Sequence, residues 1–307
     1  TPRHAGNMTT QMNRRAVLSG LATAPLFMNL DSSTHTKSRA TLKKSCKIGM
    51  VGEGADLTEK FKLLREVGFD GVEMDGPSPY DWKEVMNAKL ESGIEIPGVV
   101  CSTHWGKPLS DPSDEVRAEG VAGLETALRD ARIYGASTVL LVPGICRGEV
   151  NYKDAWDRST HEIAAVLPLA RELGVKIALE NVWNDFITEA KEAARYVDQF
   201  DDDHLGWYFD VGNIVRYDDP VNWIKVLGER IMKLDIKDYS RAKMKTDGVW
   251  KGFDCKIGAE DSSCGWSAVM AALKELGYTG WASAEVPGGG RERLAEISQN
   301  MDDVFSR

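Results

Sequence analysis

The sequence contains little cysteine and no long hydrophobic run. No stretch of 18 or more uncharged apolar residues occurs in the 307-residue chain, which excludes a protein with several membrane spans and predicts no membrane contact for the mature chain. The five cysteines form an odd set without the spacing of a zinc-binding motif. Cys255 and Cys264 lie in one segment and could pair if the protein is exported. The other three are expected to be free thiols.

Positive charge is also in short supply. The chain has 38 Lys and Arg against 47 Asp and Glu, a net charge of −9. Nucleic-acid-binding proteins neutralise phosphates with basic side chains, so this balance argues against a nucleic-acid partner. It is compatible with a site that holds a cation. The overall composition is that of an ordinary globular protein, long enough for one large α/β domain.

The N-terminal segment differs from the rest of the chain. Residues 12–30, "MNRRAVLSGLATAPLFMNL", place the pair Arg14 and Arg15 before a short, weakly apolar run rich in small residues. This layout is typical of a twin-arginine export signal and predicts a periplasmic protein; a fortuitous basic helix, and hence a cytoplasmic protein, is the alternative. Residues 31–45 are polar and indicate a linker. We therefore divide the chain into residues 1–45, signal and linker, and a catalytic domain over 46–307.

From residue 46 onward, short β-like runs alternate with amphipathic segments. Helices are expected at residues 57–68, 159–174, 218–230, 266–277 and 291–305, several of which end on glycine. Eight strands are expected at residues 46–51, 71–74, 98–102, 138–142, 176–180, 206–210, 231–237 and 281–285. This alternation predicts a single-domain (β/α)8 TIM barrel. A doubly wound open sheet is the alternative, but "GMVGEG" (49–54) is only a weak imitation of its phosphate-binding turn.

Charged residues occupy every second position of one expected strand. In "IMKLDIKD" (231–238), Lys233, Asp235 and Lys237 share one face. Three neighbouring strands each end in a carboxylate, namely Glu180, Asp210 and Glu285. Because catalytic groups of a barrel gather at the C-terminal strand ends, the four acids should converge. Clustered carboxylates repel one another unless a cation lies between them, so we expect a divalent metal site. A salt-bridged interior without metal is the alternative.

Four motifs carry a family resemblance over residues 46–305: "ALEN", "YFDVGN", "KLDIKD" and "LKELGYTGWASAE". They resemble strand ends of the xylose-isomerase-like sugar isomerase and epimerase superfamily, especially ketose 3-epimerases and pentulose- and hexulose-phosphate epimerases. The resemblance implies one divalent ion held by Glu180, Asp210, Asp235 and Glu285, with Asp235 at the family's histidine position. An all-oxygen shell favours Mn²⁺ or Mg²⁺, with Co²⁺ or Zn²⁺ as alternatives. The form "DVGN", which ends at Asn213, resembles the corresponding motif of the phosphosugar epimerases.

The family chemistry implies proton transfer next to a ketose carbonyl, with Glu180 and Glu285 as the catalytic pair. Asp75 and Trp105 are further candidates near the mouth, and residues 239–265 form a long connection typical of a lid. The glycines of "PGGGRERL" (287–294) could form an anion cradle with an arginine, or a flexible loop. The residues expected to contact the substrate are Glu73, His104, Asn213, Lys237, Trp183 and Arg291.

The leading hypothesis is a metal-dependent epimerase or isomerase of a sugar substrate. Two alternatives use the same barrel: a lyase or deglycosidase acting on 3-keto-glycosides, and a non-catalytic sugar-binding protein. A DNA-repair endonuclease is disfavoured because the chain has only five histidines, two of them in the N-terminal tail. The resemblance also allows a homodimer.

Overall fold

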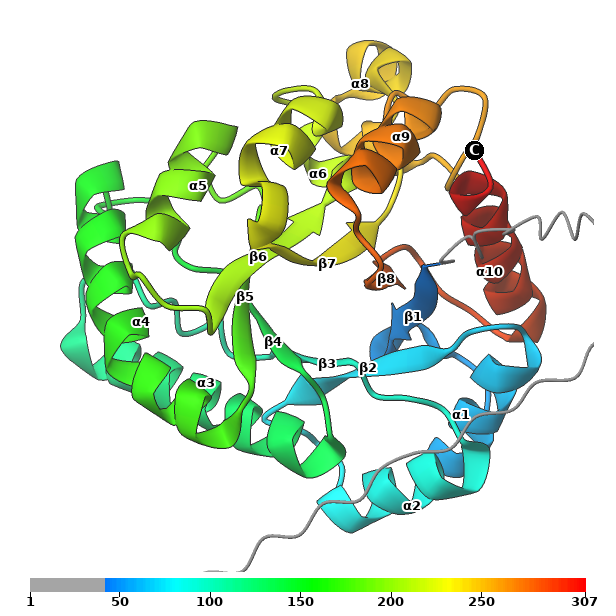
Figure 1. Cartoon of the computed structure of the whole chain (residues 1–307), viewed down its shortest axis with the longest axis horizontal. Coiled ribbons are helices and arrows are strands. Elements are labelled where there is room, and N and C mark those ends of the chain that lie inside the picture. The colour runs from blue at the N-terminus through cyan, green and yellow to red at the C-terminus, as the bar shows by residue number, and fades with distance from the viewer. Residues whose placement is uncertain (1–41) are drawn as a thin grey trace, which may run out of the picture. The chain divides into compact units, whose positions relative to one another are not determined.

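The computed structural model describes residues 42–307. Eight parallel strands form a closed barrel in the order β1 to β8, and the helices surround it (Figure 1). This confirms the predicted (β/α)8 fold. The residues of the predicted export signal lie outside the described part. The strands are β1 (Lys43–Lys47), β2 (Gly71–Gly76), β3 (Gly98–Cys101), β4 (Thr138–Leu141), β5 (Lys176–Glu180), β6 (Leu205–Asp210), β7 (Ile231–Ile236) and β8 (Trp281–Ala284).

The first strand differs most from its prediction. It begins at Lys43, so residues 43–45 belong to the barrel and not to a linker, and residues 48–50 form a short 3₁₀ helix, η1 (Ile48–Met50). Its pairing with β8, which aligns Cys46 with Ala284, closes the barrel. The apolar residues of segment 46–51 are therefore divided between the end of β1 and the 3₁₀ helix. A prediction from hydrophobicity alone consequently started the strand three residues after its true beginning.

The helices begin and end at the residues that sequence rules favour. Asp56, Ser113 and Asn151 accept a backbone hydrogen bond at the start of their helices, and Gly135 and Gly174 end two of them in the left-handed conformation. The helices are α1 (Leu57–Glu66), α2 (Trp82–Ser92), α3 (Asp114–Tyr134), α4 (Tyr152–Leu173), α5 (Ala190–Asp198), α6 (Val211–Ile214), α7 (Pro220–Leu227), α8 (Arg241–Asp247), α9 (Trp266–Leu276) and α10 (Arg291–Phe305), with 3₁₀ turns η2 (Gly228–Arg230) and η3 (Val249–Phe253).

Alternate strand residues separate an apolar layer from a polar one. In β6, Phe209 stacks on Trp223 of α7, with ring centroids 6.2 Å apart and planes 14° apart. In β7, Lys233 and Asp235 are buried within the barrel. In β6 and β7 the helix layer thus receives an apolar face, while charged groups lie in the barrel interior together with a small cluster of Leu140, Ala178 and Tyr208. This explains the charge alternation of β7.

All five cysteines are free thiols. The pairing considered for Cys255 and Cys264 is not formed: the Cys255 thiol contacts Asp261 at 3.3 Å, and the Cys264 thiol contacts the Lys237 carbonyl at 3.8 Å. Across residues 42–307, no helix combines the length and the apolar character that a bilayer span requires.

Candidate metal centre and substrate pocket

Four carboxylates meet at the C-terminal end of the barrel. Glu180 ends β5, Asp210 ends β6, Asp235 lies in β7 and Glu285 follows β8. One oxygen from each lies within 4.8 Å of one from each of the others. Sequence reasoning predicted this convergence because parallel strands bring their carboxyl ends to the same rim.

A network of amides holds Asp210 in place. The backbone N–H of Asn213 donates to Asp210 Oδ1, and its side-chain amide donates to Oδ2, each at 2.8 Å. Asn181 receives the Asp210 backbone N–H at 3.0 Å and donates to the Asp210 carbonyl at 2.8 Å. The Asn213 amide also reaches the Asn181 carbonyl. Asp210 therefore presents its carboxylate in one fixed orientation, and Asn213 acts on the site through it.

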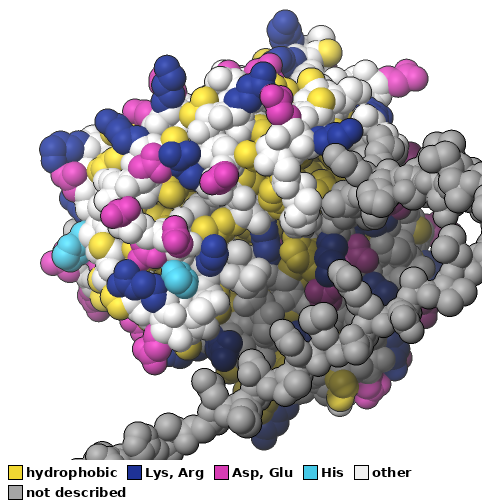
Figure 2. Space-filling view, in the orientation of Figure 1, with side chains coloured by type: hydrophobic (Ala, Val, Ile, Leu, Met, Phe, Trp, Pro, Cys, Tyr) yellow, Lys and Arg dark blue, Asp and Glu magenta, His cyan; other side chains and the backbone are white. Residues whose placement is uncertain are grey.

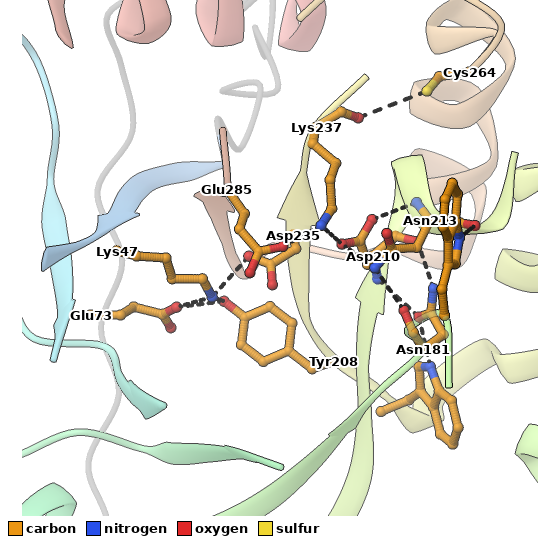
Figure 3. A network of polar contacts seen from close by, with 12 residues as sticks. Lys47, Glu73, Asn181, Tyr208, Asp210, Asn213, Asp235, Lys237, Cys264 and Glu285 are labelled. Carbon is orange, nitrogen blue, oxygen red and sulfur yellow. Dashed lines mark hydrogen bonds and ion pairs between the residues drawn. The ribbon is translucent and has the colours of Figure 1, made fainter. Parts of the chain in front are cut away.

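Two lysines pair with three of the four acids, Asp210, Asp235 and Glu285 (Figure 3). Lys237 contacts Asp210 Oδ2 at 2.9 Å and also contacts Glu285 Oε2. Lys47 lies 2.9 Å from Asp235 Oδ1 and 2.7 Å from Glu73 Oε2. Lys237 thus offsets charge on two of the four acids, whereas Lys233 pairs with Glu73, at 3.3 Å, rather than with the four acids.

The four acids, Glu73 and the three lysines that contact them carry more negative than positive charge. Five carboxylates and three lysines take part, so two net negative charges remain when every group is ionised. Burial, followed by repulsion from neighbouring acids, raises the pKa of Glu180. Burial also raises the pKa of Asp235, and it raises that of Asp210 to about 6 despite Lys237. For Glu285, Lys237 and then Lys47 outweigh burial and lower the pKa. A divalent cation would remove the repulsion.

The donor set fits such a cation. Glu180 Oε1 and both Asp235 oxygens are buried without a hydrogen-bond partner, although Asp235 Oδ1 has the ionic contact with Lys47. Oxygen ligands lie about 2.0–2.6 Å from Mg²⁺ or Ca²⁺, so ligands on opposite sides are about 4–5 Å apart. The largest separation here, 4.8 Å, lies in that range. An all-oxygen set suits Mg²⁺, Mn²⁺ or Ca²⁺ better than softer metals.

Two of the four acids, Glu180 and Glu285, line a pocket of about 700 Å³, whereas Asp210 and Asp235 are buried behind its lining. Glu180, Glu285, His104, Trp183 and Lys237 line it, as do Asn213, Asp75 and Trp105. His104 is buried, and its Nδ1 accepts the Val142 N–H at 3.2 Å. Burial lowers the pKa of His104 to about 4, so this side chain is a neutral contact group near pH 7.

Two predicted substrate contacts lie elsewhere. Arg291 pairs with Glu66 at 2.7 Å, and its backbone N–H donates to Glu53 at 2.8 Å. The start of α10 is therefore already occupied by a protein carboxylate and does not form the anion cradle considered from the sequence. Glu73 does not line the pocket. It is held inside the barrel by Lys47, by Lys233 and by the Tyr208 hydroxyl at 2.8 Å.

Three residues of the site were not predicted. Tyr208 lies two positions before Asp210 and so shares its face of β6. The spacing of these two residues in the sequence could therefore have predicted Tyr208 as part of the site. Asn181 directly follows Glu180. Lys47 belongs to β1, and only the closure of the barrel brings it beside β7 and β2.

The profile of the xylose isomerase-like TIM barrel family matches residues 61–304. This chain belongs to that family. The L-ribulose-5-phosphate 3-epimerase UlaE of Escherichia coli O1:K1 is 25% identical over 272 residues, covering 81% of this chain and 89% of that protein. The family thus includes sugar epimerases. This chain has the family's barrel, and it also has a buried acidic cluster that could bind metal.

Solved structures show the same fold. The 3-keto-D-glucoside 4-epimerase YcjR of E. coli is 16% identical with a TM-score of 0.71, covering 87% of this chain and all of that one. The IOLI protein, solved with a bound zinc atom, is 17% identical with a TM-score of 0.71, covering 86% of this chain and 98% of that one.

Proposed function

We propose that this protein is a divalent-metal-dependent epimerase or isomerase of a ketose or keto-sugar. The observation that carries the proposal is the convergence of four carboxylates, with three buried oxygens lacking hydrogen-bond partners, at the base of a pocket. Glu180, Asp210, Asp235 and Glu285 would hold the ion. When bound, it would supply Lewis-acid polarisation of a substrate carbonyl. Mn²⁺ or Mg²⁺ suits this donor set, and the named activities of the relatives support the reaction class.

Glu180 and Glu285 are the proposed proton-transfer pair. Both line the pocket, and they come from β5 and β8, three strands apart around the barrel. One carboxylate would remove the proton next to the carbonyl, and the other would return one on the opposite face. Glu180 is buried, which strengthens its electrostatic interactions, whereas the Glu285 side chain is 37% exposed. Their surroundings differ, because Lys237 contacts Glu285 whereas Glu180 Oε1 has no hydrogen-bond partner, and this difference suits two distinct roles.

We propose an unphosphorylated substrate. Lys237 is the one lysine or arginine among the described residues that line the pocket, and it is already paired with Asp210 and Glu285. Among these lining residues a phosphate group would find no unpaired cation; Arg216, which stacks on Trp183 at 4.7 Å, lies outside the lining. This distinguishes the proposal from the phosphorylated substrate in the name of the E. coli relative.

The experiment is solvent deuterium exchange followed by NMR, with a panel of free ketoses and 3-keto-glycosides and added Mn²⁺. We expect deuterium at one carbon without bond loss, abolished in Glu180→Gln and kept in Glu229→Gln, an exposed residue that precedes β7 at the opposite end of the barrel. Release of an aglycone would instead identify a lyase or deglycosidase. Unchanged sugar affinity in Glu180→Gln, with no turnover for any sugar, would identify a binding protein.

Export through the twin-arginine signal is a separate proposal that rests on residues 12–30 alone. Fusion of residues 1–45 to a reporter should direct it to the periplasm, and replacing Arg14 and Arg15 by lysine should retain it in the cytoplasm. Cytoplasmic retention of the unaltered fusion would refute the proposal.

A further inference from the structure

Exposed tryptophan is concentrated at the mouth of the pocket. All nine tryptophans lie in the described residues, and three of them are exposed: Trp82, Trp105 and Trp250. Two of these three, Trp105 at 48% exposure and Trp250 at 67%, line the pocket. On the face shown in Figure 2, charged side chains of both signs are interspersed with apolar ones. Exposed large aromatic side chains at a pocket are typical of a binding surface.

Trp250 is part of a built aromatic wall. Its ring centroid lies 4.7 Å from that of Trp183, and the Trp183 ring lies 4.8 Å from Phe253. The Trp183 indole N–H donates to the Asn213 carbonyl at 2.9 Å, which ties the wall to the residue that orients Asp210. These side chains come from the segment after β5 and from η3, so the wall joins two rim segments.

The segment that carries Trp250 is held rigidly. The Tyr239 hydroxyl donates to the Val249 carbonyl at 2.7 Å, and the Ser240 N–H donates to the Gly252 carbonyl at 2.8 Å. A Cβ at Gly252 would lie 2.3 Å from the Tyr239 ring, so only glycine fits there. Trp250 thus lies on a turn that hydrogen bonds and packing hold in place, and its side chain is exposed from that fixed position.

The pocket is larger than one sugar ring requires. Pockets of about 300–1,000 Å³ enclose most of a drug-sized ligand, and a single hexose is smaller than such a ligand. The cavity here measures about 700 Å³. Besides acids, its lining includes Trp105, Trp250 and Phe253, and Phe253 lies next to the acid site, with its ring centroid 5.6 Å from the Lys237 ammonium. The remaining volume therefore suits a neutral group with a flat apolar face.

We infer that the pocket contains a second subsite, formed by Trp250 and Phe253 with Trp105, which binds a ring attached to the reacting sugar. The substrate class is then a glycoside, a keto-sugar that carries a second ring, rather than a free monosaccharide. The inference rests on the proposed function for the identity of the reacting ring. Two kinds of ring share the required chemistry: an aromatic aglycone, and a second sugar presenting its C–H face.

The test is a binding titration of the full chain, with and without Mn²⁺, which needs no turnover. The probes are methyl and phenyl glycosides of glucose and galactose in both anomers, together with cellobiose. We expect at least one phenyl glycoside or cellobiose to bind roughly two- to tenfold more tightly than the matching methyl glycoside. Trp250→Ala should remove that preference, and Trp250→Phe should retain most of it. Trp82→Ala, an exposed tryptophan outside the pocket, should leave it unchanged.

Each result of the binding titration either supports or overturns the second subsite. A preference shown by phenyl glycosides alone supports an aromatic aglycone, and one shown by cellobiose alone supports a second sugar. Equal binding of all matched pairs, or a preference that survives in Trp250→Ala, would overturn the second subsite. The deuterium-exchange experiment tests the epimerase proposal independently. Tighter binding of two-ring ligands without proton exchange would refute the epimerase proposal and support the second subsite. Proton exchange without tighter binding of two-ring ligands would support the epimerase proposal and refute the second subsite.

Discussion

The ammonium of Lys47 lies 2.9 Å from Oδ1 of Asp235, inside the barrel. Asp235 is fully buried and occupies the position that resemblance assigns to a histidine in the family. A carboxylate in place of a neutral imidazole adds one negative charge, and Lys47 supplies a positive charge directly beside it. The burial of Asp235 thus depends on Lys47, and the two residues form one unit of the site.

Asp235→Asn should weaken Mn²⁺ binding on the order of 100-fold, because it removes an anionic oxygen ligand. Titration calorimetry of the full chain measures the affinity. Asp261→Asn is the matched control, since Asp261 pairs with Lys243 at 2.8 Å on the exposed side of the protein and should leave the affinity unchanged. Equal affinities for wild type and Asp235→Asn would remove Asp235 from the ligand set.

Lys237→Met should have the opposite effect on metal binding. The lysine pairs with Asp210 and Glu285, so its charge competes with a cation for two of the four ligands. We expect Mn²⁺ to bind at least about tenfold more tightly, a change of about 1.4 kcal/mol. The same titration measures this, and weaker binding in the variant would show that Lys237 supports the ion instead of competing with it.

Glu73→Gln should destabilise the fold by about 3–5 kcal/mol, because it leaves Lys47 and Lys233 without their shared buried counter-charge. Burial alone would raise the pKa of Glu73, but Lys47 and then Lys233 hold it at about 2, so the group is ionised in the folded protein. Urea unfolding measures the free energy. Glu95→Gln breaks an exposed pair with Lys43 and should change it by less than about 1 kcal/mol. Similar losses for both variants would refute the buried network.

His104 should make stability fall in mild acid. Its pKa is about 4 in the fold, because of burial, against 6.5 as the ordinary value. The unfolded chain therefore binds a proton first, and the stability contribution is full above pH 6.5 and is lost as pH falls towards 4. Between pH 7.5 and 5, wild type should lose about 2 kcal/mol more than His104→Gln in urea unfolding. Parallel losses in the two proteins would contradict a buried neutral His104.

The sequence allowed prediction of those features that local chemistry sets. Helix stops such as Gly174 mark the β/α alternation, although the helix expected from residue 159 begins at Tyr152 after its Asn151 cap. A barrel then forces Glu180, Asp210, Asp235 and Glu285 to one rim. Features that depend on distant segments escaped prediction. Lys47 meets Asp235 only through barrel closure, and Arg291 is held away from the pocket by Glu53 and Glu66, more than 200 positions away in the chain.

The aromatic wall was predicted only in part: Trp183 was expected to contact the substrate, whereas Trp250 was not named. The segment 239–265 was expected to cover the pocket because of its length, but nothing local indicated that η3 would place Trp250 against Trp183. That contact depends on the packing of Gly252 against Tyr239, which no periodicity reports.

The central claim is that four carboxylates bind one divalent cation. The direct measurement is anomalous diffraction from crystals soaked in Mn²⁺. We expect a single strong peak bonded to oxygens of Glu180, Asp210, Asp235 and Glu285, with Lys237 displaced from at least one of its two partners. No peak among these oxygens, with the Lys237 ion pairs intact, would contradict it.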